Sequence, residues 1–399
     1  MNDRHPDTLA VRAGRPEWPA NEPSSPPLYQ ASSYEFEDLD DVEAVYGGRK
    51  PGKIYGRYGG PNGAQFERAI AELEGAEAAV AASAGMSAID AALATNLAPG
   101  EAIVASGEVY GGTYSLLEND YRKAGFSVHY VDQTDRGAVR AALERHKPKV
   151  LHLEALTNPL MRVADLPALA ALGHEAGATV VVDATFASPV LVRPLEHGVD
   201  LVAHSAGKYI GGHGDVGAGV LAGRTELVER ARGYLARRGG TIAHFEAWLA
   251  LRGMRTLALR MARHSSNADH VAAFLAREPA VARVHHPSRP DHPQHALATR
   301  LYRRGTGGIV AFDLRDGAAA AERFFRGLET IAIVHSLGEV ATTISYPAVS
   351  SHRMLPPETR LGLGVGDGTV RISVGIEDPG DITRDLARAF AGLGERVRA

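Results

Sequence analysis

Residues 164–185, ADLPALAALGHEAGATVVVDAT, contain the pattern that decides the fold. Asp165 stands at an N-cap position, Pro167 follows in the first turn, and Gly177 ends the helical periodicity. TVVV then begins a run of β-branched residues that lacks the alternation of a half-exposed strand. Such a run is typical of a strand buried on both faces, as in a parallel sheet covered by helices. This unit therefore predicts an α/β domain.

Strand-like and helix-like segments also alternate on both sides of this unit. Strand-like runs are expected at 102–105, 126–131, 150–156, 200–206 and 217–223, and a long helical stretch around 244–276. Strands separated by helices indicate parallel βαβ units. From about residue 305 the pattern changes, because GGIVAFDL (307–314) and TVRISVGI (369–376) alternate as half-buried strands do. We expect a large domain with a mostly parallel sheet, followed by a smaller C-terminal α/β domain.

The expected division is an N-terminal segment at 1–60, a large domain at 61–252 and a small domain at 253–399. The first segment is rich in Pro and Gly, so regular structure should be sparse there. It nevertheless contains aromatic residues, which disordered tails usually lack. These are Tyr29, Tyr34, Phe36, Tyr46, Tyr55 and Tyr58. We therefore expect this segment to pack against a neighbouring subunit.

Composition excludes several classes of protein. The 399 residues include 43 Lys+Arg and 47 Asp+Glu, and this net charge of −4 offers no basic footprint for nucleic acid or an anionic membrane. Cysteine is absent from the sequence, which rules out disulfides, thiolate metal sites and a cysteine nucleophile. The polar start does not resemble a secretory leader, and there is no run of 18 apolar residues. We expect a cytoplasmic protein.

Polar side chains follow the ends of several expected strands. The carboxyl ends of parallel strands share one edge of the sheet, where ligands bind. A small-residue strand runs into 83–87 at a helix start, where free amides bind anions. The other strand ends supply Tyr110, Glu154, Asn158, Asp183, Thr185, Ser205 and Lys208. Each residue alone is weak evidence for a site, so the prediction depends on the joint arrangement.

This set of groups fits the cofactor pyridoxal phosphate. Its aldehyde needs a lysine, here Lys208, to form a Schiff base. Its ring nitrogen needs a carboxylate, here Asp183, to stay protonated and withdraw electrons. Its phosphate suits a helix start, and its flat ring suits a stacked aromatic side chain such as Tyr110.

The stretch HSAGKYIGGHGD (204–215) resembles the lysine motif of the Cys/Met-metabolism pyridoxal phosphate enzymes. Further resembling stretches occur along nearly the whole chain, among them YGRYGGP (55–61), VYGGTYSLL (109–117) and VVDATFASP (181–189). The resemblance implies a fold of type I, like that of aspartate aminotransferase. It also implies a homotetramer, assembled as a dimer of dimers with shared active sites, that acts on small sulfur amino acids.

The resemblance further implies individual roles. Lys208 would bind the cofactor and then carry protons, Asp183 would pair with the ring nitrogen, and Tyr110 would stack on the ring near the leaving group. The other implied contacts are Gly85, Met86, Thr185 and Ser205 with the cofactor, Tyr55 and Arg57 with the phosphate of a neighbouring subunit, and Asn158, Arg371, Ser336 and His335 with the substrate.

Three positions depart from the family pattern. Gly207 stands where a phosphate-binding Thr usually precedes the lysine, Gly60 where an Asn is usual, and Ala184 where an Asn often follows the aspartate. A lost phosphate hydrogen bond should weaken cofactor binding by about 1–3 kcal/mol if nothing replaces it.

The family contains γ-eliminating and γ-replacing enzymes that share these residues. The position before Ser336 tends to be Glu in enzymes that handle cystathionine and apolar in methionine γ-lyases, whereas here it is His335, which can meet polar or anionic groups. Gly112 stands where methionine γ-lyases often have a Cys. We expect γ-elimination on cystathionine, methionine or homocysteine, giving an α-keto acid, ammonia and a thiol. The alternative is γ-replacement, as in cystathionine γ-synthase or an O-acylhomoserine sulfhydrylase.

Two other patterns suggest different functions. Residues 212–217 match the dinucleotide fingerprint GxGxxG, but Glu and Asp are absent from 230–240, where a ribose-binding acid should stand. The histidines at 285, 286, 292 and 295 lie in a Pro-rich loop without a carboxylate pair, so we expect no metal site. The presence of both Lys208 and Asp183 argues against a non-catalytic scaffold.

Overall fold

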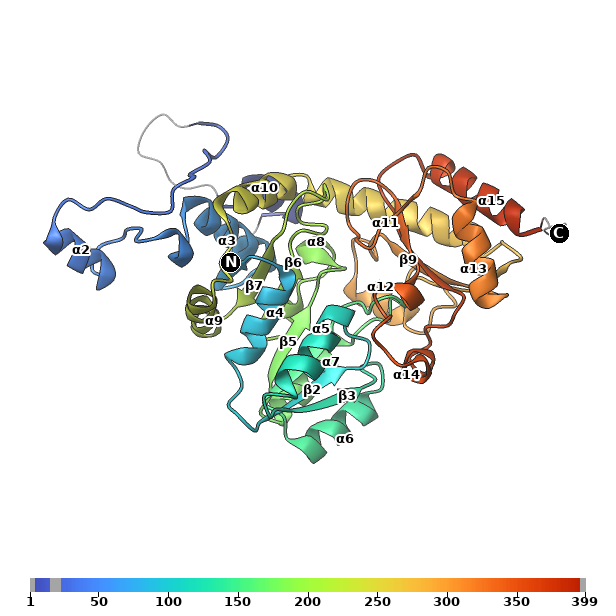
Figure 1. Cartoon of the computed structure of the whole chain (residues 1–399), viewed down its shortest axis with the longest axis horizontal. Helices are drawn as coiled ribbons and strands as arrows, with labels where there is room; N and C mark the ends of the chain where they lie inside the picture. Colours follow the sequence, from blue (N-terminus) through green and yellow to red (C-terminus); the bar gives the residue numbers. More distant parts are fainter. Residues whose placement is uncertain (1–3, 15–22, 395–399) are drawn as a thin grey trace.

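Two sheets, each packed against helices, form the framework of the protein. The computed structural model describes residues 4–14 and 23–394, so residues 15–22 of the expected N-terminal segment lie outside the described residues. Figure 1 shows the larger sheet in the middle of the molecule and the smaller sheet on the side where the chain ends. The predicted α/β class, with a mostly parallel sheet and a second smaller sheet, is confirmed.

The unit predicted at 164–185 is present as α7 (Leu166–Glu175) and β5 (Thr179–Asp183). Val180, Val181 and Val182 are fully buried, as the run of β-branched residues predicts. Asp165 lies at the N-cap position, but its side chain makes no capping bond and pairs with Arg136 instead.

The large sheet has seven strands in the order β1-β7-β6-β5-β4-β2-β3. The pairs from β3 to β6 are parallel, whereas β7 is antiparallel to both β6 and β1. The segment that joins β6 to β7 contains no helix. An antiparallel pair can be joined by such a loop, whereas a parallel pair needs a crossover connection, which is usually a helix. The strands are β1 (Ala78–Ala82), β2 (Ala102–Ser106), β3 (Ser127–Val131), β4 (Val150–Glu154), β6 (Leu201–Ser205) and β7 (Gly219–Gly223).

Helices cover both faces of this sheet and create two hydrophobic cores. One core contains buried side chains of α3, α6, α7 and α10, and the other contains those of α4 and α9. The helices of this region are α3 (Pro61–Glu74), α4 (Gly85–Ala94), α5 (Gly111–Leu116), η2 (Leu117–Tyr121), α6 (Arg136–His146), α8 (Ser188–Leu191), η3 (Pro194–His197) and α9 (Thr225–Arg238).

The helical stretch expected at 244–276 is present as two helices, α10 (His244–Met254) and α11 (Leu257–Leu275), with a break at Arg255 and Thr256. Arg260 stabilises the break, because its guanidinium donates to the Gly253 carbonyl at 2.8 Å. In an unbroken helix that carbonyl would accept from the amide four residues further on. Within the two described ranges, no helix combines the length and hydropathy needed to cross a membrane.

The small sheet has the order β10-β11-β12-β9-β8 and packs against α11, α13 and α15. Every residue of β12 is buried, and so is every residue of β9 except the partly buried Asp313, so the half-buried pattern expected for these two strands is wrong. Val370 and Ile372 face the hydrophobic core, while Arg371 lies on the opposite face and contacts the large domain. The elements are β8 (Val281–His285), α12 (His295–Leu301), β9 (Ile309–Leu314), α13 (Gly317–Arg326), β10 (Ala332–Ile333), β11 (Thr343–Ser345), η4 (Pro347–Val349), α14 (Pro357–Gly362), β12 (Thr369–Ser373) and α15 (Pro379–Gly394).

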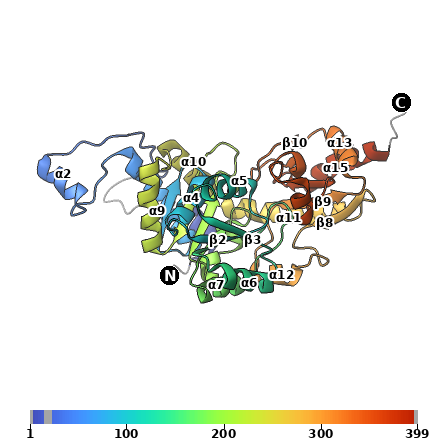
Figure 2. The ribbon, with the colours of Figure 1, turned by 60° about the horizontal axis from the view of Figure 1, so that its bottom comes forward.

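The N-terminal segment is partly packed on its own chain and partly extended. α1 (Pro6–Arg12) packs against α3 and α11, with Leu9 buried. α2 (Leu39–Tyr46) projects away from the body in Figures 1 and 2, leaving Leu39 84% and Tyr46 63% exposed. Exposed apolar side chains of this kind suit a protein contact. The contact with a neighbouring subunit stays a prediction, as do the domain boundaries.

A histidine inside the large sheet predicts acid sensitivity. His152 in β4 is fully buried, neither ring nitrogen has a hydrogen-bond partner among the described residues, and burial lowers its pKa from 6.5 to about 4. Because the pKa in the folded state lies below the unfolded value, the unfolded chain binds the proton more readily between pH 6.5 and 4. The free energy of unfolding therefore falls as the pH falls through this window.

We expect His152→Leu to remove this contribution. Between pH 7 and pH 5 the wild-type protein should lose about 2 kcal/mol of unfolding free energy that the variant keeps. Urea unfolding at both pH values measures the difference, with the surface variant His270→Leu as the control. Equal pH dependence in wild type and His152→Leu would contradict the prediction.

Candidate active site

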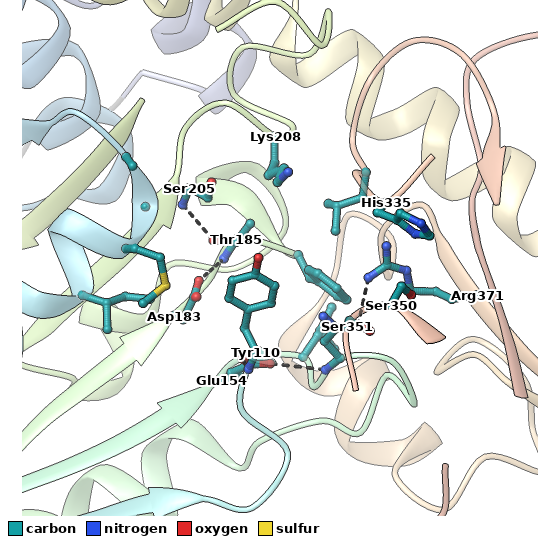
Figure 3. A pocket seen from close by; sticks show the side chains of 18 of the residues that line it. Tyr110, Glu154, Asp183, Thr185, Ser205, Lys208, His335, Ser350, Ser351 and Arg371 are labelled. Atoms are coloured by element: carbon teal, nitrogen blue, oxygen red, sulfur yellow. Dashed lines mark hydrogen bonds between the residues drawn. The ribbon is translucent and has the colours of Figure 1, made fainter. Parts of the chain in front are cut away.

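A cavity of about 600 Å³ lies at the carboxyl ends of the parallel strands, between the two sheets. Figure 3 shows Asp183 and Lys208 on the large-domain side, with His335 and Arg371 across the cavity. Ten residues expected at the site line it, namely Gly85, Met86, Tyr110, Asn158, Asp183, Thr185, Ser205, Lys208, His335 and Arg371. Most of them follow strands of the large sheet, and His335 and Arg371 come from the small domain.

Lys208 lies in the turn that follows β6. Its Nζ donates a hydrogen bond to Ser336 Oγ at 2.7 Å, which brings the eleventh expected residue to the cavity. Burial and, to a smaller extent, the Arg371 guanidinium lower the pKa of Lys208 below its ordinary value. A lowered pKa makes the neutral amine, which is the nucleophile and base, more available.

Asp183 is the last residue of β5, and its carboxylate faces the cavity. Its Oδ1 accepts from the Thr185 amide at 2.9 Å, and Thr185 Oγ1 in turn accepts from the Ser205 amide at 2.8 Å. The carboxylate is partly open to the cavity yet enclosed by protein, and this burial raises its pKa. No described cationic side chain forms an ion pair with it. The carboxylate is therefore suited to a positively charged group that enters the cavity.

The first turn of α4 forms an anion cradle. Ala84 at the N-cap makes no side-chain capping bond, so the first amides of the helix stay free. A Cβ on Gly85 would lie 2.7 Å from the Cβ of Ser205, so only glycine fits this approach of helix to strand. The site combines free amides, a positive helix end and the Ser205 hydroxyl, which together suit a phosphate.

Packing explains two of the three departures from the family pattern. A side chain at Gly207 would collide with the Val216 carbonyl, so the backbone after the lysine turn occupies the room that a threonine would need. At Gly60 the imidazole of His244 fills the corresponding space. Nothing in the structure explains Ala184.

Glu154 is a site residue for which the sequence suggested no role. Its Oε1 accepts from the Tyr110 amide at 2.5 Å and its Oε2 from the Asn158 amide at 3.2 Å, so it joins two strand-end loops. Burial first, and then the charge of Asp183, raise its pKa well above the ordinary value. Glu154 is the register partner of Asp183 in the β4–β5 pair. Its position at a strand end was therefore the sequence feature from which a place in the site could have been predicted. Tyr110 stands in the cavity with 45% of its side chain exposed.

Arg371 projects from β12 into the buried end of the cavity. It donates to Asn158 Oδ1 at 3.0 Å and to the Ser336 carbonyl at 3.2 Å, while its Nε has no hydrogen-bond partner among the described residues. Burial lowers its pKa to about 10, so it stays charged at neutral pH. A buried guanidinium with a free N–H suits a carboxylate.

The small domain also supplies lining residues that the sequence did not indicate. Ser350, Ser351 and Arg353 follow η4, and they line the cavity together with His335. No sequence signal would have found them, because their approach depends on how the small domain packs.

Tyr55 and Arg57 do not line the cavity of their own chain. Tyr55 is 47% exposed, and Arg57 donates to the Ala236 carbonyl at 2.6 Å on the outer surface. Their expected role in a neighbouring subunit's site stays a prediction.

The histidines that could suggest a metal make ordinary hydrogen bonds, and they do not all lie in the expected loop, because His285 ends β8 and His295 begins α12. His285 bonds Asp313 at 2.7 Å, His286 bonds Ser288 at 2.8 Å and His295 bonds the Pro287 carbonyl at 3.0 Å. In the part of the chain that the structure describes, no group of three or more His, Asp or Glu side chains is placed to hold a metal ion.

Comparison with known proteins places this geometry in a family. The family model of the Cys/Met metabolism PLP-dependent enzymes matches residues 7–391. The chain belongs to this family. An O-succinylhomoserine sulfhydrylase of Pseudomonas aeruginosa is 42% identical over 97% of this chain and 95% of its own length. An L-methionine gamma-lyase of Pseudomonas putida is 38% identical over 92% of each chain.

A solved structure agrees with this membership. Cystathionine gamma synthase from Xanthomonas oryzae pv. oryzae, crystallised with aminoacrylate and cysteine, matches with a TM-score of 0.93. It is 36% identical and covers 98% of this chain and 99% of that one. The protein is thus a pyridoxal-phosphate-dependent enzyme of sulfur amino-acid metabolism.

The residues of the cavity fit this cofactor. Lys208 offers a partly buried amine of lowered pKa, Asp183 a carboxylate without an ion-pair partner among the described residues, and α4 a cradle at its first turn. These three groups match the aldehyde, the ring nitrogen and the phosphate of pyridoxal phosphate. Gly207 removes one hydroxyl from the expected phosphate site without removing the cradle.

Proposed function

We propose that the enzyme replaces the acyl group at the γ-carbon of an O-acylhomoserine by sulfur. The bond between the γ-carbon and the ester oxygen breaks, a carboxylate leaves, and a bond to sulfur forms. With hydrogen sulfide the products are homocysteine and a carboxylic acid, so atoms and charges balance. The 42% identity to an O-succinylhomoserine sulfhydrylase supports this choice among the family's reactions.

The single observation that carries the proposal is the distribution of carboxylates around the cavity. Among the described residues that line it, Asp183 and Glu154 are the acidic ones, and both belong to the strand ends of the large domain. The small-domain wall offers His335, Ser350 and Ser351, but no acid to hold the ammonium group of cystathionine or of incoming cysteine. This wall favours a γ-substituent without an ammonium group and a simple sulfur nucleophile.

The chain's own residues are placed for this chemistry. When bound, pyridoxal phosphate withdraws electrons from the carbons next to the substrate's amino group and makes their protons acidic. Lys208 Nζ would take up a proton from the α-carbon and return it after the new bond has formed. Arg371 would hold the α-carboxylate, and Tyr110 Oη is the acid available to the leaving group.

γ-Elimination is the second candidate, and the relation to an L-methionine gamma-lyase supports it. It is the reaction favoured by the sequence, on cystathionine, methionine or homocysteine. The same proton transfers by Lys208 would serve it, because the two reactions diverge only after the γ-substituent has left.

One comparison of activities separates these candidates. The purified holoenzyme receives O-succinylhomoserine or O-acetylhomoserine with sulfide, and in parallel cystathionine, methionine or homocysteine alone. We expect homocysteine to form from an acylhomoserine at least about tenfold faster than 2-ketobutyrate forms from any sulfur amino acid. Rapid 2-ketobutyrate release without homocysteine formation would overturn the proposal in favour of γ-elimination.

A further inference from the structure

One wall of the cavity belongs to the small domain and lies across from Asp183 and Lys208 (Figure 3). This distal wall consists of His335, Ser350, Ser351 and Arg353. Arg353 is exposed, unlike the buried Arg371, so it lies where the cavity opens to solvent. The distal wall is therefore placed to contact the part of a substrate furthest from its reacting end.

The distal wall is anchored against the large domain. A side chain at Gly111, the first residue of α5, would collide with the Ser351 carbonyl, so the two backbones lie in close contact beside Tyr110. The next residue, His352, is only 2% exposed, and its Nδ1 lies 2.9 Å from Ser351 Oγ. Arg353 therefore follows directly on a backbone segment that is packed against the large domain, and this packing places its backbone near the cavity.

The charges that line the cavity leave one cation without a partner. Lys208 bonds Ser336, and Arg371 bonds Asn158. The Arg353 guanidinium makes no hydrogen bond or ion pair with any residue that the structure describes. The acidic lining residues cannot serve it, because Glu154 accepts from two backbone amides and Asp183 faces the cofactor site.

We infer that the distal wall is a subsite for a carboxylate at the far end of the γ-substituent, with Arg353 as its ionic partner and His335 as a second contact. Guanidinium and carboxylate pair through two parallel N–H···O bonds, which gives orientation as well as affinity. The substrate class is then an amino acid whose γ-substituent ends in a carboxylate. This inference rests on the proposed action at the γ-carbon, and both O-succinylhomoserine and cystathionine carry such a group.

A binding experiment tests the subsite without turnover. L-2-Aminosuberate and L-2-aminooctanoate have the same chain length and no leaving group, and only the first ends in a carboxylate. Their dissociation constants for the holoenzyme follow from the change in cofactor absorbance. We expect aminosuberate to bind about tenfold more tightly to the wild type, a preference consistent with a charged hydrogen bond at a partly exposed site.

Variants at Arg353 then show whether this residue causes the preference for aminosuberate. Arg353→Met should abolish it, and Arg353→Lys should keep part of it. Met354→Ala is the matched control, since Met354 is the next residue, is 70% exposed and does not line the cavity. An unchanged preference in Arg353→Met, or equal binding of both ligands by the wild type, would overturn the inference.

Measurements of activity then show which substrate carries the carboxylate that binds in the subsite. We expect Arg353→Met to lower kcat/KM about tenfold for O-succinylhomoserine and to leave that for O-acetylhomoserine unchanged. A loss confined to cystathionine, compared with methionine, would instead assign the carboxylate to a cystathionine substrate. Aminosuberate binding needs no reaction, so the binding test can support the subsite even if the proposed γ-replacement is not observed. Conversely, the activity test can support γ-replacement even if Arg353 has no effect on aminosuberate binding.

Discussion

Lys208→Ala is expected to abolish turnover, with a loss on the order of 10⁴-fold or more in kcat. In the proposed mechanism this side chain would supply both the amine that binds the cofactor and the base that moves the substrate proton, so one change would remove two functions. The structure shows no described lysine other than Lys208 among the residues lining the cavity, and therefore no substitute.

The absorption spectrum of the purified variant checks this expectation. Wild-type enzyme should show the visible band of lysine-bound cofactor, and Lys208→Ala should show only the spectrum of free or non-covalently held cofactor. Lys123→Ala, a change at an exposed lysine, is the control and should keep band and activity. Activity in Lys208→Ala that matches the wild type would refute the assignment of this lysine.

The strand-end residues could be predicted because their positions follow from local pattern. A run such as TVVV must end at one edge of a parallel sheet, so the residues just after it, Asp183 and Thr185, gather there with those of the other strands. The chemistry of an amine, a carboxylate and a helix start then indicated one cofactor. Glu154 stood at such a strand end too, but its bonds to backbone amides leave no mark in the sequence.

Contacts between distant segments could not be predicted in this way. Arg371 and Asn158 are 213 residues apart, and their bond depends on how the small sheet docks. The same docking buries the polar face of β12, which periodicity alone assigns to solvent. Arg353 lies in an irregular segment whose approach to the cavity is a tertiary effect. At Gly207 the sequence revealed a missing hydroxyl, but not that the Val216 backbone occupies its place.

Asp183→Asn is expected to lower kcat by about 10²–10³-fold while the fold is retained. The amide has nearly the shape of the carboxylate but no charge, so it cannot keep the ring nitrogen of the bound cofactor protonated. Without that proton the ring withdraws electrons weakly, and the substrate protons that Lys208 would remove in the proposed mechanism become less acidic. Steady-state kinetics on the holoenzyme measures the loss, and Asp120→Asn at an exposed carboxylate is the control.

The same substitution should not lower the stability of the apoenzyme, and this separates a functional role for Asp183 from a structural one. Burial raises the pKa of this carboxyl, so its ionised form is less favourable in the cofactor-free fold than in the unfolded chain. The folded pKa lies above the unfolded one, and at neutral pH the charge therefore reduces the unfolding free energy of the apoenzyme. Asp183→Asn should leave the apoenzyme as stable as the wild type or more so, measured by urea unfolding after cofactor removal. A large loss of apoenzyme stability together with unchanged kcat would show that Asp183 supports the fold and not the reaction.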